Sequence, residues 1–228
     1  MARVPQALCD PGRSRRLSRL AAATLVIIGA AAFAVVTAQS RRQPLDLSVP
    51  ITFFIADGAG RTGYQAGDRD LAKWALDDWQ RASGVPLRLT AAPEAAALIR
   101  VYWADPADGQ YGEMRPILVG GRRGAAVFIR PATTGLGADV ARQATLDPLF
   151  RDTVVYLTCV HELGHALGLD HTDDYRDIMY AFGFGGDLVE YFARYRRQLT
   201  SRSDIARVSV PSASDLARLR EVYPARPR

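Results

Sequence analysis

The sequence predicts an α+β domain, spanning residues 45–228, in which one twisted sheet packs against helices. Short apolar runs that end at turn residues recur from residue 49 to residue 130, as expected for strands. Segments with hydrophobic residues three and four positions apart indicate helices, and they dominate the last third of the chain. The composition, 48% hydrophobic and 23% charged over 228 residues, is typical of one globular domain with appendages.

Five short apolar runs are predicted to be strands because turn residues bound them. The first ends at the turn signal Asp57-Gly58, and the last two are separated by Gly120-Gly121. In chain order, the predicted strands are 49–56, 86–90, 97–103, 116–119 and 125–130.

The predicted helices follow from apolar spacing and capping residues. Segment 68–83 places Trp74 and Trp79 at helical spacing, and Gly84 follows it as a C-cap. Asp152 is a capping residue and is predicted to begin a long helix that ends at Leu167. The remaining predictions are an irregular loop over 131–149, a helix over 187–199, and a helix over 215–222 capped by Ser212 or Ser214.

The excess positive charge is confined to the N-terminal segment. Residues 1–42 carry seven arginines and one aspartate, whereas residues 43–228 carry 22 basic and 23 acidic residues. The nearly neutral domain argues against nucleic-acid binding, which needs a basic face. Residues 21–38 are uncharged and apolar, and they follow the basic flank 1–20, which is the layout of a secretory signal.

Two interpretations of residues 21–38 stay open. The segment could be a signal peptide cleaved after Ala38, or a retained anchor of about 27 Å, which nearly matches a bilayer core of about 30 Å. In both cases the domain is expected to lie outside the cytoplasm, either secreted or anchored by one N-terminal transmembrane segment.

All three histidines of the chain lie within eleven residues, in the run His-Glu-Leu-Gly-His-Ala-Leu-Gly-Leu-Asp-His at 161–171. His161 and His165 are four apart, so on a helix both imidazoles can reach one metal ion. Gly168 allows the helix to stop and the chain to turn, which returns His171 as a third ligand. Three nitrogen ligands leave a fourth position for water, as in catalytic zinc sites.

Glu162 is predicted to be the general base of this site. It follows His161 directly and is turned too far around the helix to be a good ligand. It is close enough to hydrogen-bond a water molecule at the metal. A purely structural zinc site would not need such a carboxylate, so Glu162 favours an enzyme.

The spacing H-E-x-x-H-x-x-G-x-x-H at 161–171 resembles the zinc motif of metzincin metalloproteases. A methionine turn beneath the metal is their other hallmark, and Asp-Ile-Met-Tyr at 177–180 is similar to it. The short interval to Met179 and the Ile-Met-Tyr sequence resemble matrixins in particular. The resemblance implies a zincin-like fold with a twisted, mostly parallel sheet, an active-site helix and a C-terminal helix.

The resemblance also implies a function, a zinc-dependent endopeptidase with one catalytic Zn²⁺ that cleaves extracytoplasmic proteins or peptides. Met179 would underlie the metal without binding it, and Tyr180 would either contact substrate or simply pack. The edge strand around 113–119 could align an extended substrate by strand addition. A narrow-specificity processing peptidase, a peptidoglycan-associated hydrolase and a membrane-tethered zinc-binding protein without turnover stay open as alternatives.

The sequence departs from the matrixin pattern in several places. No histidine is left for the second, structural zinc ion that matrixins usually bind, and Cys9 lies too far away for their usual cysteine latency switch. Thr172 stands where matrixins usually have serine, and the segment after Met179 is long, with an added helix. Substrate preference therefore does not carry over from the family.

Three smaller features of the sequence concern a possible cation, a thiol and an aromatic helix. The carboxylates of Asp105, Asp108 and Glu113 could bind Ca²⁺, although a solvated turn explains them more simply. Cys159 is expected to be a buried, inert thiol. The aromatic and basic residues of 187–199 favour an amphipathic packing helix over contact with a membrane surface.

Overall fold

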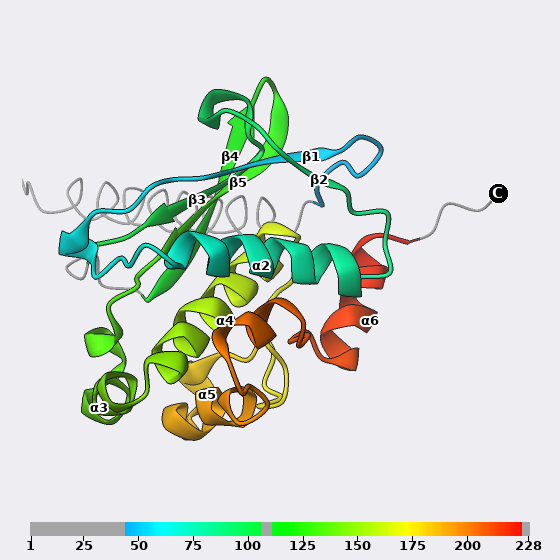
Figure 1. Cartoon of the computed structure of the whole chain (residues 1–228). Coiled ribbons are helices and arrows are strands. Elements are labelled where there is room, and N and C mark those ends of the chain that lie inside the picture. The colour runs from blue at the N-terminus through cyan, green and yellow to red at the C-terminus, as the bar shows by residue number, and fades with distance from the viewer. Residues whose placement is uncertain (1–43, 106–110, 225–228) are drawn as a thin grey trace, which may run out of the picture. The chain divides into compact units, whose positions relative to one another are not determined.

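The computed structural model describes residues 44–105 and 111–224 (Figure 1). The predicted flank 1–20, the apolar segment 21–38 and most of the candidate calcium loop lie outside the described residues. Within the described ranges, no helix combines the length and the apolar character needed to cross a bilayer.

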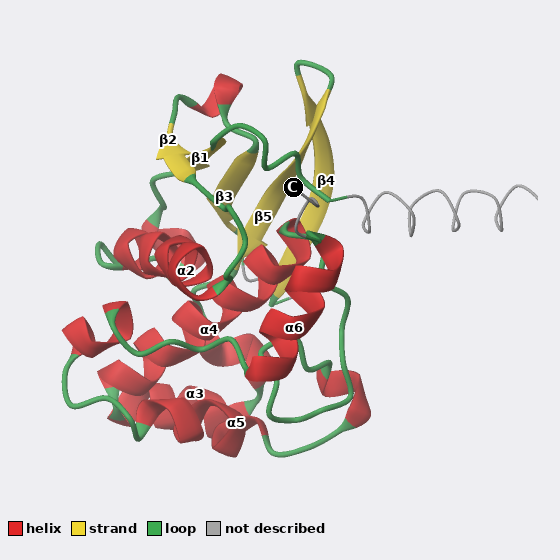
Figure 2. Cartoon of the chain, turned by 90° about the vertical axis from the view of Figure 1, so that its right-hand side faces the viewer, coloured by secondary structure: helices red, strands yellow, loops and turns green. Residues whose placement is uncertain are grey.

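A five-stranded sheet has the order β2-β1-β3-β5-β4, and Figure 2 shows it beside the helices. Strand β1 pairs in parallel with β2 and β3, β3 pairs in parallel with β5, and β4 pairs antiparallel with β5. The mostly parallel sheet is therefore confirmed, with β4 at one edge. The strands are β1 (Ile51–Ile55), β2 (Leu89–Ala91), β3 (Ile99–Trp103), β4 (Gly112–Val119) and β5 (Arg122–Ile129).

The hairpin of β4 and β5 is longer than the sequence predicted. Each strand has eight residues, and the turn between them places Gly120 and Gly121 at φ of 56° and 77°. Two successive left-handed residues match the twist of a two-residue hairpin, which explains the glycine pair. Pro116 was predicted to begin this strand, but it lies inside β4. A proline is tolerated there because β4 is an edge strand, where a missing amide donor costs little.

Two predictions about the helices are wrong. The supposed loop 131–149 contains a helix, and the long active-site helix begins at Pro148 rather than beside Asp152. Asp147 is the true N-cap, since its carboxylate accepts the amides of Leu149 and Phe150 at 3.0 and 3.2 Å. Proline is favoured at the first helical position because its missing amide is not needed there. The helices are α2 (Asp68–Ala82), α3 (Ala138–Leu146), α4 (Pro148–Ala166), α5 (Leu188–Arg196) and α6 (Ala213–Val222).

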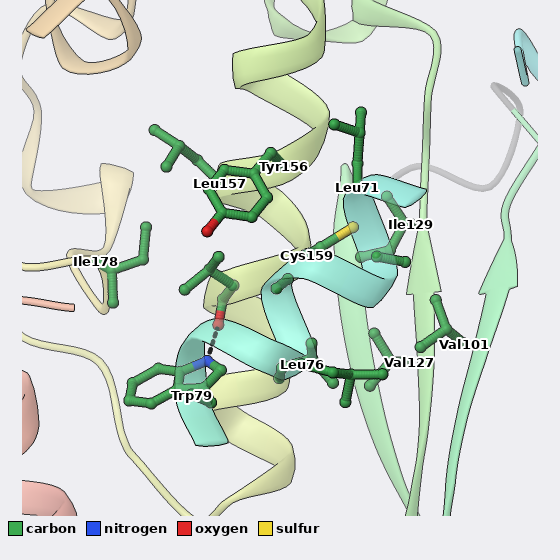
Figure 3. Packing of buried hydrophobic residues seen from close by; sticks show 14 of the residues in the cluster. Leu71, Leu76, Trp79, Val101, Val127, Ile129, Tyr156, Leu157, Cys159 and Ile178 are labelled. Atoms are coloured by element: carbon green, nitrogen blue, oxygen red, sulfur yellow. Dashed lines mark hydrogen bonds between the residues drawn. The ribbon is translucent and has the colours of Figure 1, made fainter. Parts of the chain in front are cut away.

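The core lies between the sheet and helices α2 and α4, which pack on the same side of it (Figure 2). Leu71 and Leu76 of α2 face Val127 and Ile129 of β5, and the indole of Trp79 donates to the Val160 carbonyl at 2.9 Å (Figure 3). Most of α4 is buried, so the helix that carries His161 and His165 is fixed in place. Cys159 is buried in this core and burial raises the pKa of its thiol, as expected for an inert cysteine.

Candidate metal centre and active site

The end of α4 sets the geometry of the site. The helix stops at Ala166, and Gly168 has φ of 99°, a left-handed conformation that suits glycine. The Gly168 amide donates to the His165 carbonyl at 3.0 Å, and the Leu169 amide donates to the Gly164 carbonyl at 3.0 Å. This pair of bonds is a Schellman motif, which reverses the chain and leads it back past the helix.

The reversal brings all three histidines together. The Nε2 atom of His171 lies 3.1 Å from that of His161 and 3.0 Å from that of His165. A tetrahedral zinc ion with Zn–N bonds of about 2.0–2.1 Å separates its nitrogen ligands by about 3.3 Å. The Nε2 atom of His171 is therefore near a ligand-to-ligand distance from both other rings, and the three candidate ligand atoms all lie within 4.8 Å of one another.

Backbone carbonyls orient two of these rings. The Nδ1 atom of His161 lies 2.6 Å from the Ile178 carbonyl oxygen, and Nδ1 of His165 lies 2.7 Å from that of Leu169. Because a carbonyl only accepts, each Nδ1 carries the proton and each Nε2 keeps its lone pair. Burial, together with the neighbouring His165, lowers the pKa of His161 to about 3, so this ring is neutral at pH 7. Neutral rings with free lone pairs fit a metal site.

Glu162 is buried beside the histidines, against strand β4. A Cβ atom placed on Gly112 would lie only 2.5 Å from Oε1 of Glu162, so a side chain at position 112 would displace the carboxylate. Glu162 lines two cavities, one that His161 also lines and one that His165 also lines. Gly112 was not identified from the sequence, because nothing local distinguishes a glycine that makes room for a distant carboxylate.

Met179 lies beneath α4, where the absence of a side chain on Gly164 allows the methionine to approach the helix closely. Its side chain is fully buried, and a Cβ atom on Gly164 would lie 2.4 Å from the Met179 sulfur and 3.2 Å from the Trp79 ring. A parallel bridge between Thr172 and Tyr180 ties the methionine turn to the segment that follows the third histidine. The close contact between Gly164 and Met179 therefore sets the distance between α4 and the methionine turn.

Replacing Gly164 with alanine is expected to lower the free energy of unfolding by up to about 2 kcal/mol. Crowding of a packed core costs about 1–3 kcal/mol, and the better helix propensity of alanine offsets about 1 kcal/mol of that cost. Urea denaturation measures the change. Gly60→Ala is a suitable control because a Cβ atom there would meet nothing within 4 Å. Equal stability of the two variants would show that Met179 moves aside at little cost.

Two buried aspartates, Asp177 and Asp215, stabilise the region of the methionine turn. Asp215 accepts the amides of Ile178 and Met179 at 2.9 and 3.4 Å, and its other partners include Arg218 at 2.6 Å. Asp177 accepts the Arg218 guanidinium at 3.1 Å. Asp215 was not identified from the sequence as a residue of the site. Its only signal was its place three residues after Ser212, where it completes a capping box.

A largely apolar cavity of about 520 Å³ opens beside the histidines. It extends from Glu162 and His161 towards Leu136 and Phe192, so it reaches between α4 and α5. Its lining also includes Tyr180, which is buried and donates a hydrogen bond to the Gly185 carbonyl at 2.8 Å. Tyr180 therefore both packs and forms part of the cavity wall.

Helix α5 supplies another wall of this cavity. Tyr191, Phe192 and Tyr195 are buried, and the Tyr191 hydroxyl donates to the Asp177 carbonyl at 3.0 Å. The guanidinium of Arg194 lies 4.1 Å from the centre of the Tyr191 ring, a cation–π contact. The predicted amphipathic packing role of this helix is confirmed.

The chain is similar in sequence to one known protein family. The sequence profile of the matrixin family matches residues 50–185, more than half of the chain. Macrophage metalloelastase of Oryctolagus cuniculus is 33% identical over 97 residues, which are 42% of this chain and 20% of that protein, so the chain spans about a fifth of that relative's length.

Two solved structures of myroilysin are also similar. One has a TM-score of 0.41 at 16% identity, covering 83% of this chain and 98% of the other. The second has a TM-score of 0.36 at 18% identity, covering 77% and 83%. On the profile match across residues 50–185, the chain belongs to the matrixin family of peptidases.

Proposed function

We propose that this protein is a zinc-dependent endopeptidase that hydrolyses peptide bonds of extracytoplasmic proteins, with residues 45–228 as its catalytic domain. The observation that carries the proposal is the convergence of three Nε2 atoms beside a buried carboxylate, at the mouth of an apolar cavity. His161, His165 and His171 would hold the zinc ion. Zinc supplies Lewis acidity, which polarises a carbonyl and makes water more acidic.

The residues of the chain would divide the remaining work. The Glu162 carboxylate would accept the proton of the attacking water and deliver it to the leaving amine. Strand β4 is one of the two edge strands of the sheet, so its outer edge could pair with an extended peptide beside Glu162. The apolar cavity would receive a side chain next to the cleaved bond, which would hold that bond against the carboxylate.

The extracytoplasmic setting is supported by the sequence. Residues 21–38 have the apolar run and basic flank of an export signal or anchor.

Cleavage of an unfolded protein by the full chain tests the proposed function. We expect cleavage that stops when a chelator removes the metal and returns when zinc is restored. Product termini should come from internal peptide bonds, as for an endopeptidase. Cleavage that persists at full rate in excess chelator would contradict a metal-dependent mechanism, and a folded, zinc-loaded protein that cleaves nothing would favour a zinc-binding protein without turnover.

A further inference from the structure

The hairpin of β4 and β5 projects beyond the other strands, with its turn at the top of the view in Figure 2. Strand β3 pairs with β5 only from Ala125 onward, so the end of the hairpin extends past the sheet. We call residues 116–123 the hairpin tip. It consists of the apolar run Pro-Ile-Leu-Val at 116–119, the Gly-Gly turn, and two arginines that lie opposite Leu118 and Val119.

The apolar side chains of the hairpin tip are open to solvent. Leu118 is 77% exposed, the highest value for any large apolar residue that the structure describes. Pro116 is also exposed, and it lies on the same face of β4 because side chains two residues apart share a face. An exposed apolar edge strand tends to pair with other chains unless something covers it. The tip therefore has the properties of a contact surface.

The charge of the hairpin differs from that of the domain as a whole. Residues 114–129 contain three arginines and no acidic residue, although residues 43–228 carry 22 basic and 23 acidic residues. Arg115 forms an ion pair with Glu113 at 2.7 Å, whereas Arg122, at the turn itself, has an exposed side chain at the end of the tip. The tip thus presents a guanidinium group beside exposed apolar side chains.

This combination matches the surface of an anionic lipid bilayer. Apolar side chains are stabilised at the boundary between headgroups and acyl chains, and arginines beside them bind anionic headgroups. A soluble anion would account for the arginine alone, and an apolar protein surface for the leucine alone. Residues 39–43 are all that separates the apolar segment 21–38 from Pro44, so a retained segment would keep the domain near a bilayer.

The hairpin tip and the catalytic cleft lie at opposite ends of β4. Gly112 begins the strand beside Glu162, and Val119 ends it. At about 3.3 Å per residue, these two ends are about 23 Å apart along the strand. Contact between the tip and a bilayer therefore leaves the cleft accessible.

We propose that the hairpin tip is a membrane-contact surface, in which Leu118 enters the headgroup boundary of an anionic bilayer and Arg122 binds lipid phosphate. The proposal goes beyond the proposed function and does not rest on it, because lipid binding is measured without cleavage. Together with the proposed function, it places the preferred substrates among proteins at a membrane surface.

Quenching by brominated lipids tests whether the tip enters a bilayer. Leu118→Trp adds a fluorophore to the tip of the full chain, and Leu146→Trp adds one at a 70% exposed position at the end of α3. Each variant is mixed with vesicles of brominated phosphatidylcholine, with or without an equal share of brominated phosphatidylglycerol, and the emission of the unaltered chain is subtracted. We expect the anionic vesicles to quench about half of the added emission in Leu118→Trp and less than about a tenth in Leu146→Trp.

Charge variants test the lipid chemistry. Adding Arg122→Ala to Leu118→Trp should lower the ratio of quenched to unquenched emission about fivefold, as expected for one arginine at an anionic surface. Adding Arg142→Ala, which removes a 65% exposed arginine on α3, should change that ratio less than about twofold. Equal quenching in Leu118→Trp and Leu146→Trp, or equal quenching by neutral and anionic vesicles, would overturn the proposal. Added emission that varies with protein concentration but not with lipid would identify a second copy of the chain as the occupant and would overturn it as well.

Discussion

Replacing Glu162 with glutamine is expected to lower kcat/KM about a thousandfold while the protein still binds zinc. Glutamine has nearly the same shape and fits the space beside Gly112, where a larger change would disturb β4. It cannot accept a proton from water at neutral pH, and loss of a general base typically costs 10²–10⁴-fold, so about 10³-fold is a central expectation. Steady-state cleavage of a fluorogenic peptide, measured beside zinc content, gives both quantities.

The control for this prediction is Glu190→Gln. Glu190 is an exposed carboxylate on α5 that pairs with Arg197, so its loss removes the same charge without altering the histidine site. It should keep cleavage within about twofold, because surface ion pairs contribute little. If Glu162→Gln retained more than a tenth of the activity, Glu162 would not be the general base. If it lost its zinc as well, the loss of activity would have to be assigned to the metal site.

Replacing Asp215 with alanine is expected to lower the free energy of unfolding by about 3–5 kcal/mol, the usual cost of breaking a buried ion pair. The change removes the side-chain acceptor of the Ile178 and Met179 amides, and it removes one of the two carboxylates that the Arg218 guanidinium contacts. It should also weaken zinc binding about 10–100-fold, because the Ile178 carbonyl orients the ring of His161. Urea denaturation and competition with a zinc chelator measure the two effects.

The chain offers a close control for Asp215. Asp139 pairs with Arg142 across the same three-residue helical spacing, but its side chain is 79% exposed whereas that of Asp215 is fully buried. Asp139→Ala should therefore cost less than about 1 kcal/mol and leave zinc affinity unchanged. Equal costs for the two variants would contradict the role assigned to Asp215.

Local patterns in the sequence identified the elements that carry the site. The histidine spacing, the glycine that ends α4 and the Ile-Met-Tyr turn are all contained within twenty residues, so their arrangement depends on helix geometry and one C-cap. The sheet followed from apolar runs with turn residues between them. These features are local, and local geometry can be inferred from spacing.

Other features could not be predicted from local patterns. In some cases two residues were equally good candidates for one role, and in others the interacting residues are far apart in the sequence. Both Asp147 and Asp152 could cap a helix, and only the preference of Pro148 for the first helical position decides between them. Helix α3 was missed because only Val140 and Ala144 of its nine residues are buried, which leaves little periodic signal. The bonds from Asp215 to the methionine turn join residues more than thirty positions apart, which no local pattern reports.

The zinc content of the purified full chain tests the central claim most directly. The claim is that His161, His165 and His171 hold one catalytic zinc ion. In the structure, the Nε2 atom of His171 lies 3.1 Å from that of His161 and 3.0 Å from that of His165. We predict one zinc per chain in the unaltered protein, and less than about a tenth of that in His165→Ala after dialysis against a weak chelator, with cleavage lost in parallel. Full zinc content and cleavage in His165→Ala would contradict the account.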